Sequence, residues 1–195
     1  MKKKFMIALA LVLCIAIALP VAAVAAGFVP SVTYKGGPIV VDAFMMDAEG
    51  QLLDVNLYGG SCIVVTTVEE AREEKTDILQ EERDLLIEVY EALEKGEMTL
   101  PLEEEHVIRD LVDISFKHAN CRQINDHNNK HDLLNQDDVI LGLTLKLGIE
   151  PETELAVLYY VNEEWVQIET VVNNGDGTVT CHFPEICPVA FVVLG

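Results

Sequence analysis

The period of the hydrophobic and polar positions changes along the chain and divides it into blocks. Within residues 27–67, stretches of strand character alternate with turn residues, and the predicted strands are Pro38–Phe44, Gln51–Leu57 and Cys62–Thr67. The connections at residues 47–50 and 59–60 contain glycine and have lengths typical of β-hairpins. The pattern therefore predicts an N-terminal block of β-strands at 27–67.

Residues 68–116 have a helical period instead. Thr67 and Glu70 match a capping box at the start of the first helix. A break is predicted near residues 75–77, because Thr and Asp cap helices, and Gly96 is a typical C-terminal stop. Apolar residues recur at helical spacing in the second part of this helix: Leu85, Leu86, Val89, Tyr90 and Leu93.

A second helix is predicted to begin at Leu100-Pro101 and to end near Phe116. Proline is favoured in the first turn of a helix, and the negative charges at residues 103–105 suit the helix dipole. An apolar stripe would follow at Val107, Ile108, Leu111 and Val112. The two helices together form a predicted helical insertion at 68–116.

Residues 117–137 are polar, rich in His and Asn and without a period, so they are interpreted as a long loop. From residue 138 to residue 195 the pattern is that of strands, predicted at 138–147, Glu154–Val161, Trp165–Val172, Thr178–Phe183 and Pro188–Leu194. Strands spaced by about 8 to 12 residues are typical of a sandwich or barrel. The predicted fold is mainly β and β-sandwich-like with a two-helix insertion, α+β overall.

The N-terminus has the order of a secretory signal peptide. Three lysines at positions 2–4 precede an uncharged apolar run from Phe5 to Ala26, which Pro20 interrupts and which ends in small residues. We expect residues 1–26 to be removed before Gly27 and the protein to be secreted. The alternative is an uncleaved signal-anchor, because the run is long enough to span roughly 30 Å of hydrocarbon as a helix.

The net charge of the chain limits the classes of partner that it can bind. The formal net charge is −20, and removal of Lys2, Lys3 and Lys4 with the leader makes it −23. Nucleic acid is excluded as a partner, because binding phosphates needs a basic surface. No membrane attachment is expected after cleavage of the signal, and the expected partner is an unknown extracellular protein or glycan.

Four cysteines follow the leader, and an even number in an exported chain favours disulfides. They are Cys62, Cys121, Cys181 and Cys187, and three pairings are open. Cys181 and Cys187 are close in sequence, and a bridge between them would leave Cys62 with Cys121.

The loop at 117–137 contains a constellation that suits zinc. His118, Cys121, His127 and His131 supply imidazole and thiolate ligands, and a His pair spaced like His127 and His131 lies on one face of a helical turn. Asp126 or Asp132 would supply a further ligand. The competing interpretation is a polar loop with a disulfide-bonded Cys121, and no cofactor is then expected.

Three further patterns are open to a structural and a functional interpretation. The sequence Asn173-Asn174-Gly175-Asp176-Gly177 resembles a calcium loop, but a hairpin turn explains it. Cys62 with His106 or His118 would give a cysteine hydrolase, although no local signature surrounds it. Trp165 is interpreted as a core residue, and one of Tyr159 and Tyr160 as part of a contact surface, because neighbours in a strand face opposite sides.

Parts of the chain resemble a known group of proteins. The segments are Val161–Val193, Glu81–Tyr90 and Cys62–Thr67. They are similar to uncharacterised exported proteins of Gram-positive anaerobes that carry a C-terminal β-sandwich-like module. The resemblance implies a fold and no catalytic residue.

The sequence therefore predicts a secreted, non-catalytic binding or structural domain whose ligand is unknown. The first alternative is an extracytoplasmic zinc-binding protein that uses the loop at 117–137. The second is a hydrolase directed at wall or glycan substrates.

Overall fold

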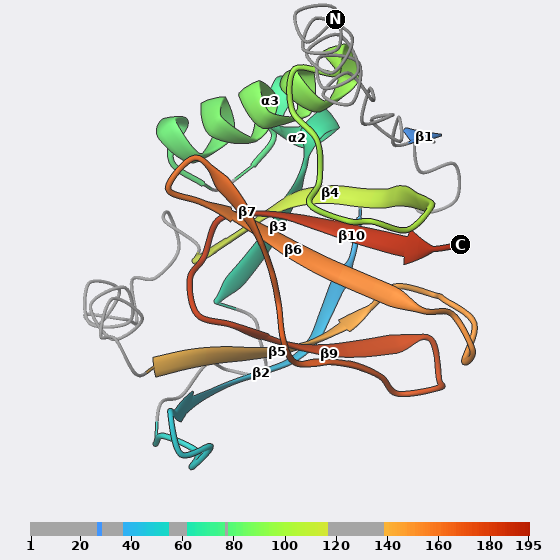
Figure 1. Cartoon of the computed structure of the whole chain (residues 1–195). Coiled ribbons are helices and arrows are strands. Elements are labelled where there is room, and N and C mark those ends of the chain that lie inside the picture. Colours follow the sequence, from blue (N-terminus) through green and yellow to red (C-terminus); the bar gives the residue numbers. More distant parts are fainter. Residues whose placement is uncertain (1–26, 29–36, 55–61, 77, 117–138) are drawn as a thin grey trace, which may run out of the picture.

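The computed structural model describes residues 27–28, 37–54, 62–76, 78–116 and 139–195. The predicted leader at 1–26 lies outside the described residues. So does the loop at 117–137, with the proposed zinc ligands His118, Cys121, Asp126, His127, His131 and Asp132. The described residues form three layers, which are a pair of helices, a first β-sheet and a second β-sheet (Figure 1).

The first sheet follows the strand order β1, β4, β10, β6, β7, and β3 also pairs with β4. β1 pairs with β4 in parallel, and the other pairings in this sheet are antiparallel. The strands are β1 (Gly27–Phe28), β3 (Ile63–Thr67), β4 (His106–Phe116), β6 (Leu155–Val161), β7 (Glu164–Gln167) and β10 (Pro188–Leu194).

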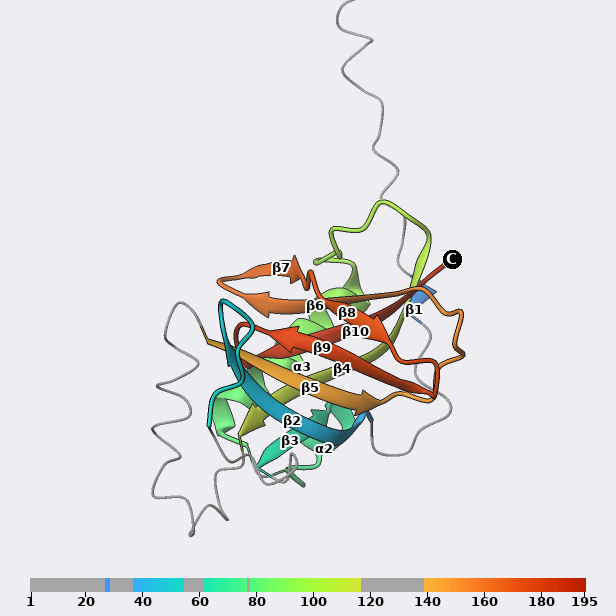
Figure 2. The same cartoon turned by 90° about the horizontal axis from the view of Figure 1, so that it is seen from below.

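The second sheet is antiparallel, with the order β2, β5, β9, β8. Its strands are β2 (Ile39–Asp47), β5 (Val139–Lys146), β8 (Val171–Asn173) and β9 (Thr178–Phe183). It faces the first sheet across a shared core (Figure 2). Alternate residues of β5 point into that core, and Leu141, Leu143 and Leu145 are fully buried. The predicted mainly β, sandwich-like α+β fold is confirmed.

Two helices cover the outer side of the first sheet, α2 (Val68–Arg72) and α3 (Gln80–Lys95). The capping box is confirmed, because Thr67 Oγ1 accepts from the Glu70 N–H at 3.2 Å and Glu70 Oε2 accepts from the Thr67 N–H at 2.9 Å. Gly96 ends α3 in the left-handed conformation, with φ 70°. Neither helix has both the length and the apolar character needed to cross a bilayer.

The prediction of a helix from Leu100 to Phe116 is wrong, because residues 106–116 form strand β4. The register of β4 with β10 shifts between Phe191 and Val192, which pair with Asp110 and Ile108. This bulge places one extra residue in β4, so Ile108 and Leu111 both pack on the helix side of the sheet. Their spacing of three imitates a helical stripe. β4 is also covered on both sides, which removes the simple alternation of a half-exposed strand.

Two predicted strands also differ in the structure. The stretch Trp165–Val172 is split into β7 and β8, which belong to different sheets. The chain crosses between the sheets at residues 168–170, and Ile168 enters the shared core there. Of the predicted strand Gln51–Leu57, the described part forms only a single bridge, between Leu52 and Met46.

The inter-sheet core should dominate the stability of the fold. Leu143 is 0% exposed between the sheets, whereas Leu52 is 72% exposed. We expect Leu143→Ala to lower the free energy of unfolding by about 2 to 5 kcal/mol through lost burial and a residual cavity. The matched change Leu52→Ala should stay within about 0.5 kcal/mol of the parent. Urea unfolding followed by circular dichroism measures both, and equal losses would contradict the assigned core.

Candidate functional site

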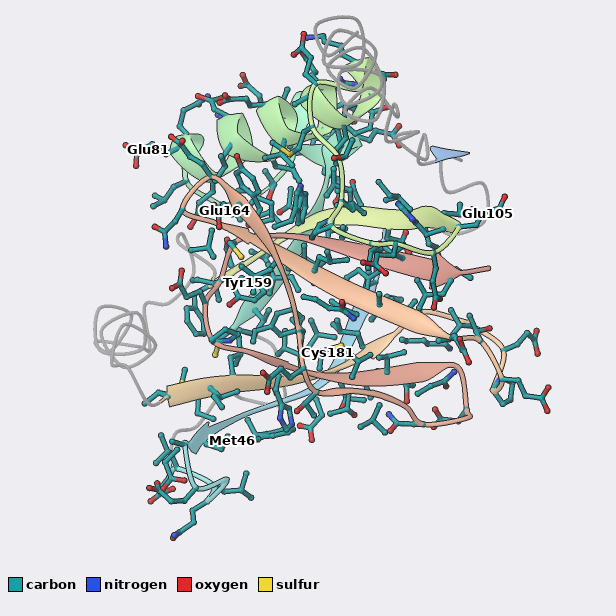
Figure 3. All side chains as sticks on the ribbon, in the orientation of Figure 1. Met46, Glu81, Glu105, Tyr159, Glu164 and Cys181 are labelled. Carbon is teal, nitrogen blue, oxygen red and sulfur yellow. The ribbon has the colours of Figure 1, made fainter. Side chains whose placement is uncertain are left out.

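An open cleft of about 810 Å³ lies where α3 faces the turn between β6 and β7. Leu85 and Glu88 share one face of α3, because residues three apart are neighbours on a helix. Figure 3 shows Glu81, near the start of α3, and Glu164, at the start of β7, on the same side of the molecule. We call this site the α3 cleft; its lining residues are Leu85, Glu88, Tyr160, Val161, Asn162, Glu163 and Cys187.

The turn that forms one wall of the α3 cleft has an unusual backbone. Val161 pairs with Glu164, so only Asn162 and Glu163 connect β6 to β7. Their φ angles are 51° and 65°. A two-residue hairpin turn of this type requires positive φ at both positions, which Asn tolerates and Gly favours. Glu163 therefore adopts a disfavoured conformation at the place where its carboxylate lines the α3 cleft.

The α3 cleft has an acidic character. Burial raises the pKa of the Tyr160 hydroxyl, and the carboxylates of Glu163 and Glu88 raise it further. These two carboxylates come from opposite walls, one from the turn and one from α3. No Lys or Arg is among the lining residues. The α3 cleft therefore presents two negative charges beside a neutral phenol.

The aromatic residues on β6 and β7 are held in the protein body. Tyr160 packs against Trp165 with ring centroids 5.3 Å apart, and Trp165 is 8% exposed. The Trp165 Nε1–H donates to Met98 Sδ at 3.0 Å, so its interpretation as a core residue is confirmed. Tyr159 packs on the inter-sheet core and Tyr160 on the core beneath the helices. The expectation that only one of them joins a core is therefore wrong, because β6 is covered on both faces; Tyr160 also lines the α3 cleft, so its place in a contact surface stays a prediction.

Asp113 is a buried carboxyl group on β4, opposite Pro188, which follows the cleft residue Cys187. It lies on the helix side of β4 with Leu111 and Ser115, because alternate residues of a strand share a face. Its side chain is only 1% exposed, the Ser115 hydroxyl donates to Oδ2, and Oδ1 has no hydrogen-bond partner. Burial raises the pKa of Asp113 to about 7; the Ser115 hydrogen bond opposes this rise and the nearby charge of Glu82 adds to it.

Cys187 connects Asp113 to the α3 cleft. Burial raises the pKa of the Cys187 thiol to about 12; a backbone hydrogen bond from Tyr160 opposes the rise, and the negative charges of Asp113 and Glu185 add to it. Asp113 pairs with Pro188 across β4 and β10, and the Ile114 N–H donates to the Cys187 carbonyl oxygen at 3.2 Å, so Asp113 is next to the residue that lines the cleft. The thiol stays protonated at neutral pH, so Cys187 is not set up as a nucleophile.

The short-range disulfide predicted between Cys181 and Cys187 is absent, because both are free thiols. Cys181 lies on β9 of the second sheet and points into the inter-sheet core, as Tyr159 does from the first sheet (Figure 3). Cys187 precedes β10 of the first sheet. The sheet assignment separates residues that are close in sequence. A bridge between Cys62 and Cys121 stays a prediction, because Cys121 lies outside the described residues.

The suggested pairing of Cys62 with His106 is wrong. Cys62 precedes Ile63, which pairs with Phe116 at one end of β4. His106 is at the other end of this 11-residue strand, where its Nδ1 lies 2.8 Å from the Glu104 carbonyl oxygen. The alternative partner, His118, is outside the described residues.

The sequence suggested two metal sites, a zinc site in the loop at 117–137 and a calcium loop at 173–177. The zinc hypothesis for His118, Cys121, His127 and His131 stays a prediction, and the described residues contain no other cluster of three or more potential ligands. The hairpin interpretation of residues 173–177 is confirmed, because they connect β8 to β9. Asp176 Oδ1 accepts from the Thr178 N–H at 3.0 Å and from its hydroxyl at 2.6 Å, so the turn uses that oxygen itself.

Sequence reasoning missed the α3 cleft and Asp113. A signal for Asp113 exists, because Asp113 and Ser115 interrupt an apolar strand segment with polar side chains that share a face. No local signal shows that Glu88 and Glu163 line the same cleft, because the two residues are distant in sequence.

The chain matches no protein-family model, no curated protein and no solved structure. Its class is therefore given by the fold, which is a β-sandwich-like α+β protein with helices over one of its two sheets.

The buried carboxyl group should make stability depend on pH. The pKa of Asp113 is raised in the folded state, so its stabilising contribution is complete below about pH 4 and is lost as pH rises through about 7. We expect the free energy of unfolding of Asp113→Asn, taken relative to that of the parent, to rise by up to roughly 4 kcal/mol between pH 4 and pH 8. Urea unfolding at several pH values measures this difference. The exposed control Asp54→Asn should run parallel to the parent, and a parallel Asp113→Asn curve would refute the assignment.

Glycine substitutions at two adjacent residues of the α3 cleft turn should change the free energy of unfolding in opposite directions. Glu163→Gly should raise the free energy of unfolding by about 0.5 to 1 kcal/mol, because glycine accepts positive φ without steric cost. Glu164→Gly should lower it by about 0.5 to 1 kcal/mol, because Glu164 lies in strand β7. Thermal unfolding compares the pair at equal net charge. A loss in both variants would show that Glu163 is unstrained.

Proposed function

We propose that this chain is a secreted, non-catalytic binding domain and that the α3 cleft is its binding site. The observation that carries the proposal is the combination of an acidic, tyrosine-lined cleft with a buried carboxyl oxygen that has no partner beneath it. Binding sites are typically concave and combine apolar walls with a few polar groups. The export part of the proposal is supported by the leader-like residues 1–26.

The chemistry of the α3 cleft favours binding over covalent catalysis. A cysteine nucleophile needs a depressed pKa, and the pKa of Cys187 is displaced in the opposite direction. Asp113 is covered by the protein, so it cannot reach a substrate by direct contact in this conformation. The remaining polar groups, which include Glu88, Glu163 and Asn162, are suited to hydrogen bonds and charge pairing.

The experiment is a ligand screen read by heteronuclear NMR on the protein recovered from the culture medium of its host. The probes are basic, acidic and neutral peptides and neutral oligosaccharides. We expect the shift changes from at least one probe class to gather around Leu85, Glu88, Tyr160 and Glu163. Leu85→Lys should abolish them, because it replaces an apolar lining side chain by a charged one, whereas the exposed control Leu52→Lys should preserve them.

Three outcomes would contradict the proposal. The first is that shift changes gather away from the α3 cleft or survive Leu85→Lys. The second is turnover of any probe by the protein. The third is recovery of the full-length chain from the cytosol alone, which would remove the export part.

A further inference from the structure

We infer that the α3 cleft binds a cationic side chain of a partner protein, a lysine ammonium or an arginine guanidinium, between Glu88 and Glu163. The Asp113 carboxyl group beneath it acts as the buried counter-charge and gives up its proton when the cation binds. This inference rests on the proposed function and adds to it the chemical class of the ligand.

Charge complementarity is the first support. Glu88 and Glu163 face the same space from opposite walls, and neither belongs to an ion pair among the described residues. The cations of the helix layer near these carboxylates are Arg72, Arg83 and Lys95, and the Arg83 Nη2–H donates to Gln80 Oε1. Arg72 lies 3.7 Å from Glu91 and stacks over Tyr90, and Lys95 lies 3.1 Å from Glu91. The two cleft carboxylates are therefore available to a positive group from another molecule.

The second support is independent of the surface charges. Asp113 Oδ1 is inaccessible to solvent and has no hydrogen-bond partner; among the described residues it is the carboxyl oxygen in this state, together with the nitrogens Arg83 Nε, His106 Nε2 and Arg109 Nη1. The groups that face this carboxyl are the Ser115 hydroxyl of β4, the Glu82 carboxylate of α3 and the Cys187 thiol ahead of β10. None of them is positively charged. A cation in the α3 cleft would supply the missing opposite charge across the wall that Cys187 forms.

A linkage between binding and protonation follows from this arrangement. An opposite charge nearby favours the ionised form of a carboxyl group. A bound ammonium should therefore shift Asp113 towards its carboxylate, and up to one proton should be released. By reciprocity, binding should strengthen as pH rises through neutrality.

A metal ion is the competing cation. The described residues contain no group of three or more His, Cys, Asp or Glu placed to hold one, and a calcium ion needs six to eight oxygen ligands. An ammonium or guanidinium needs fewer acceptors and forms charge-assisted hydrogen bonds with separated carboxylates. The geometry therefore favours the organic cation.

The test is isothermal titration calorimetry at low ionic strength with an N-acetylated, C-amidated trilysine peptide. The matched control peptide is the same molecule with its three side-chain amines acetylated, and calcium chloride is titrated separately. We expect the trilysine peptide alone to bind. Glu88→Gln and Glu163→Gln should each weaken binding about fivefold or more, and the exposed control Glu49→Gln, which removes the same charge, should change it less than twofold.

The role of Asp113 is measured in the same system. Titrations in two buffers of different ionisation enthalpy should show proton release near pH 7 in the parent protein and in Glu49→Gln. Asp113→Asn should bind the trilysine peptide without releasing a proton. Release that persists in Asp113→Asn would overturn the counter-charge role, even if the cleft carboxylates prove necessary for binding.

The outcomes separate this inference from the function on which it rests. Equal weakening by Glu49→Gln, equal binding of the acetylated peptide, or binding of calcium alone would overturn the cationic side chain as ligand. If a neutral or acidic probe binds at the α3 cleft and trilysine does not, the inference fails while the proposed function stands. If no probe perturbs the α3 cleft, both fail.

Discussion

The central strands of the first sheet are buried on both faces, and the rest of the structure depends on that constraint. One face of β4, β6 and β10 packs on the second sheet, and the other packs under α2 and α3. A sheet with two apolar faces cannot leave either one in water without losing hydrophobic stabilisation. The helix pair is therefore required by the sheet, and the two cores share its central strands. Phe191 serves the core between the sheets, while Ala190, its neighbour, lets the helices approach.

The same constraint explains the location of the polar residues. Thr66, Asp113 and Ser115 lie on the covered helix side, where they pair with protein groups because water is excluded. Thr66 Oγ1 lies 2.6 Å from Thr76 Oγ1, and Ser115 donates to Asp113. The other carboxyl oxygen of Asp113, Oδ1, has no hydrogen-bond partner. An unpaired buried polar atom costs stability, and this one belongs to the strand residue opposite Pro188, next to the cleft residue Cys187.

Much of the fold is readable from local sequence. The capping box at Thr67, the stop at Gly96 and the strands β9 and β10 were all accessible, because caps, turns and alternation are short-range signals. β4 was not, because a bulge and two-sided burial gave it a helical spacing. The cleft was also inaccessible. It joins α3 to a turn more than 60 residues later in the chain, and only tertiary packing brings these segments together.

The order of strands along the chain differs from their order in the first sheet. β10 is made after β4 and β6 and yet lies between them, pairing with both. Neither of the earlier strands finds this neighbour until residues 188–194 have been synthesised. The hydrophobic centre therefore closes late, and contacts of such long sequence separation form slowly. Late closure of the core keeps the nascent polypeptide unfolded for longer. This property suits a protein that, as proposed, is translocated before it folds.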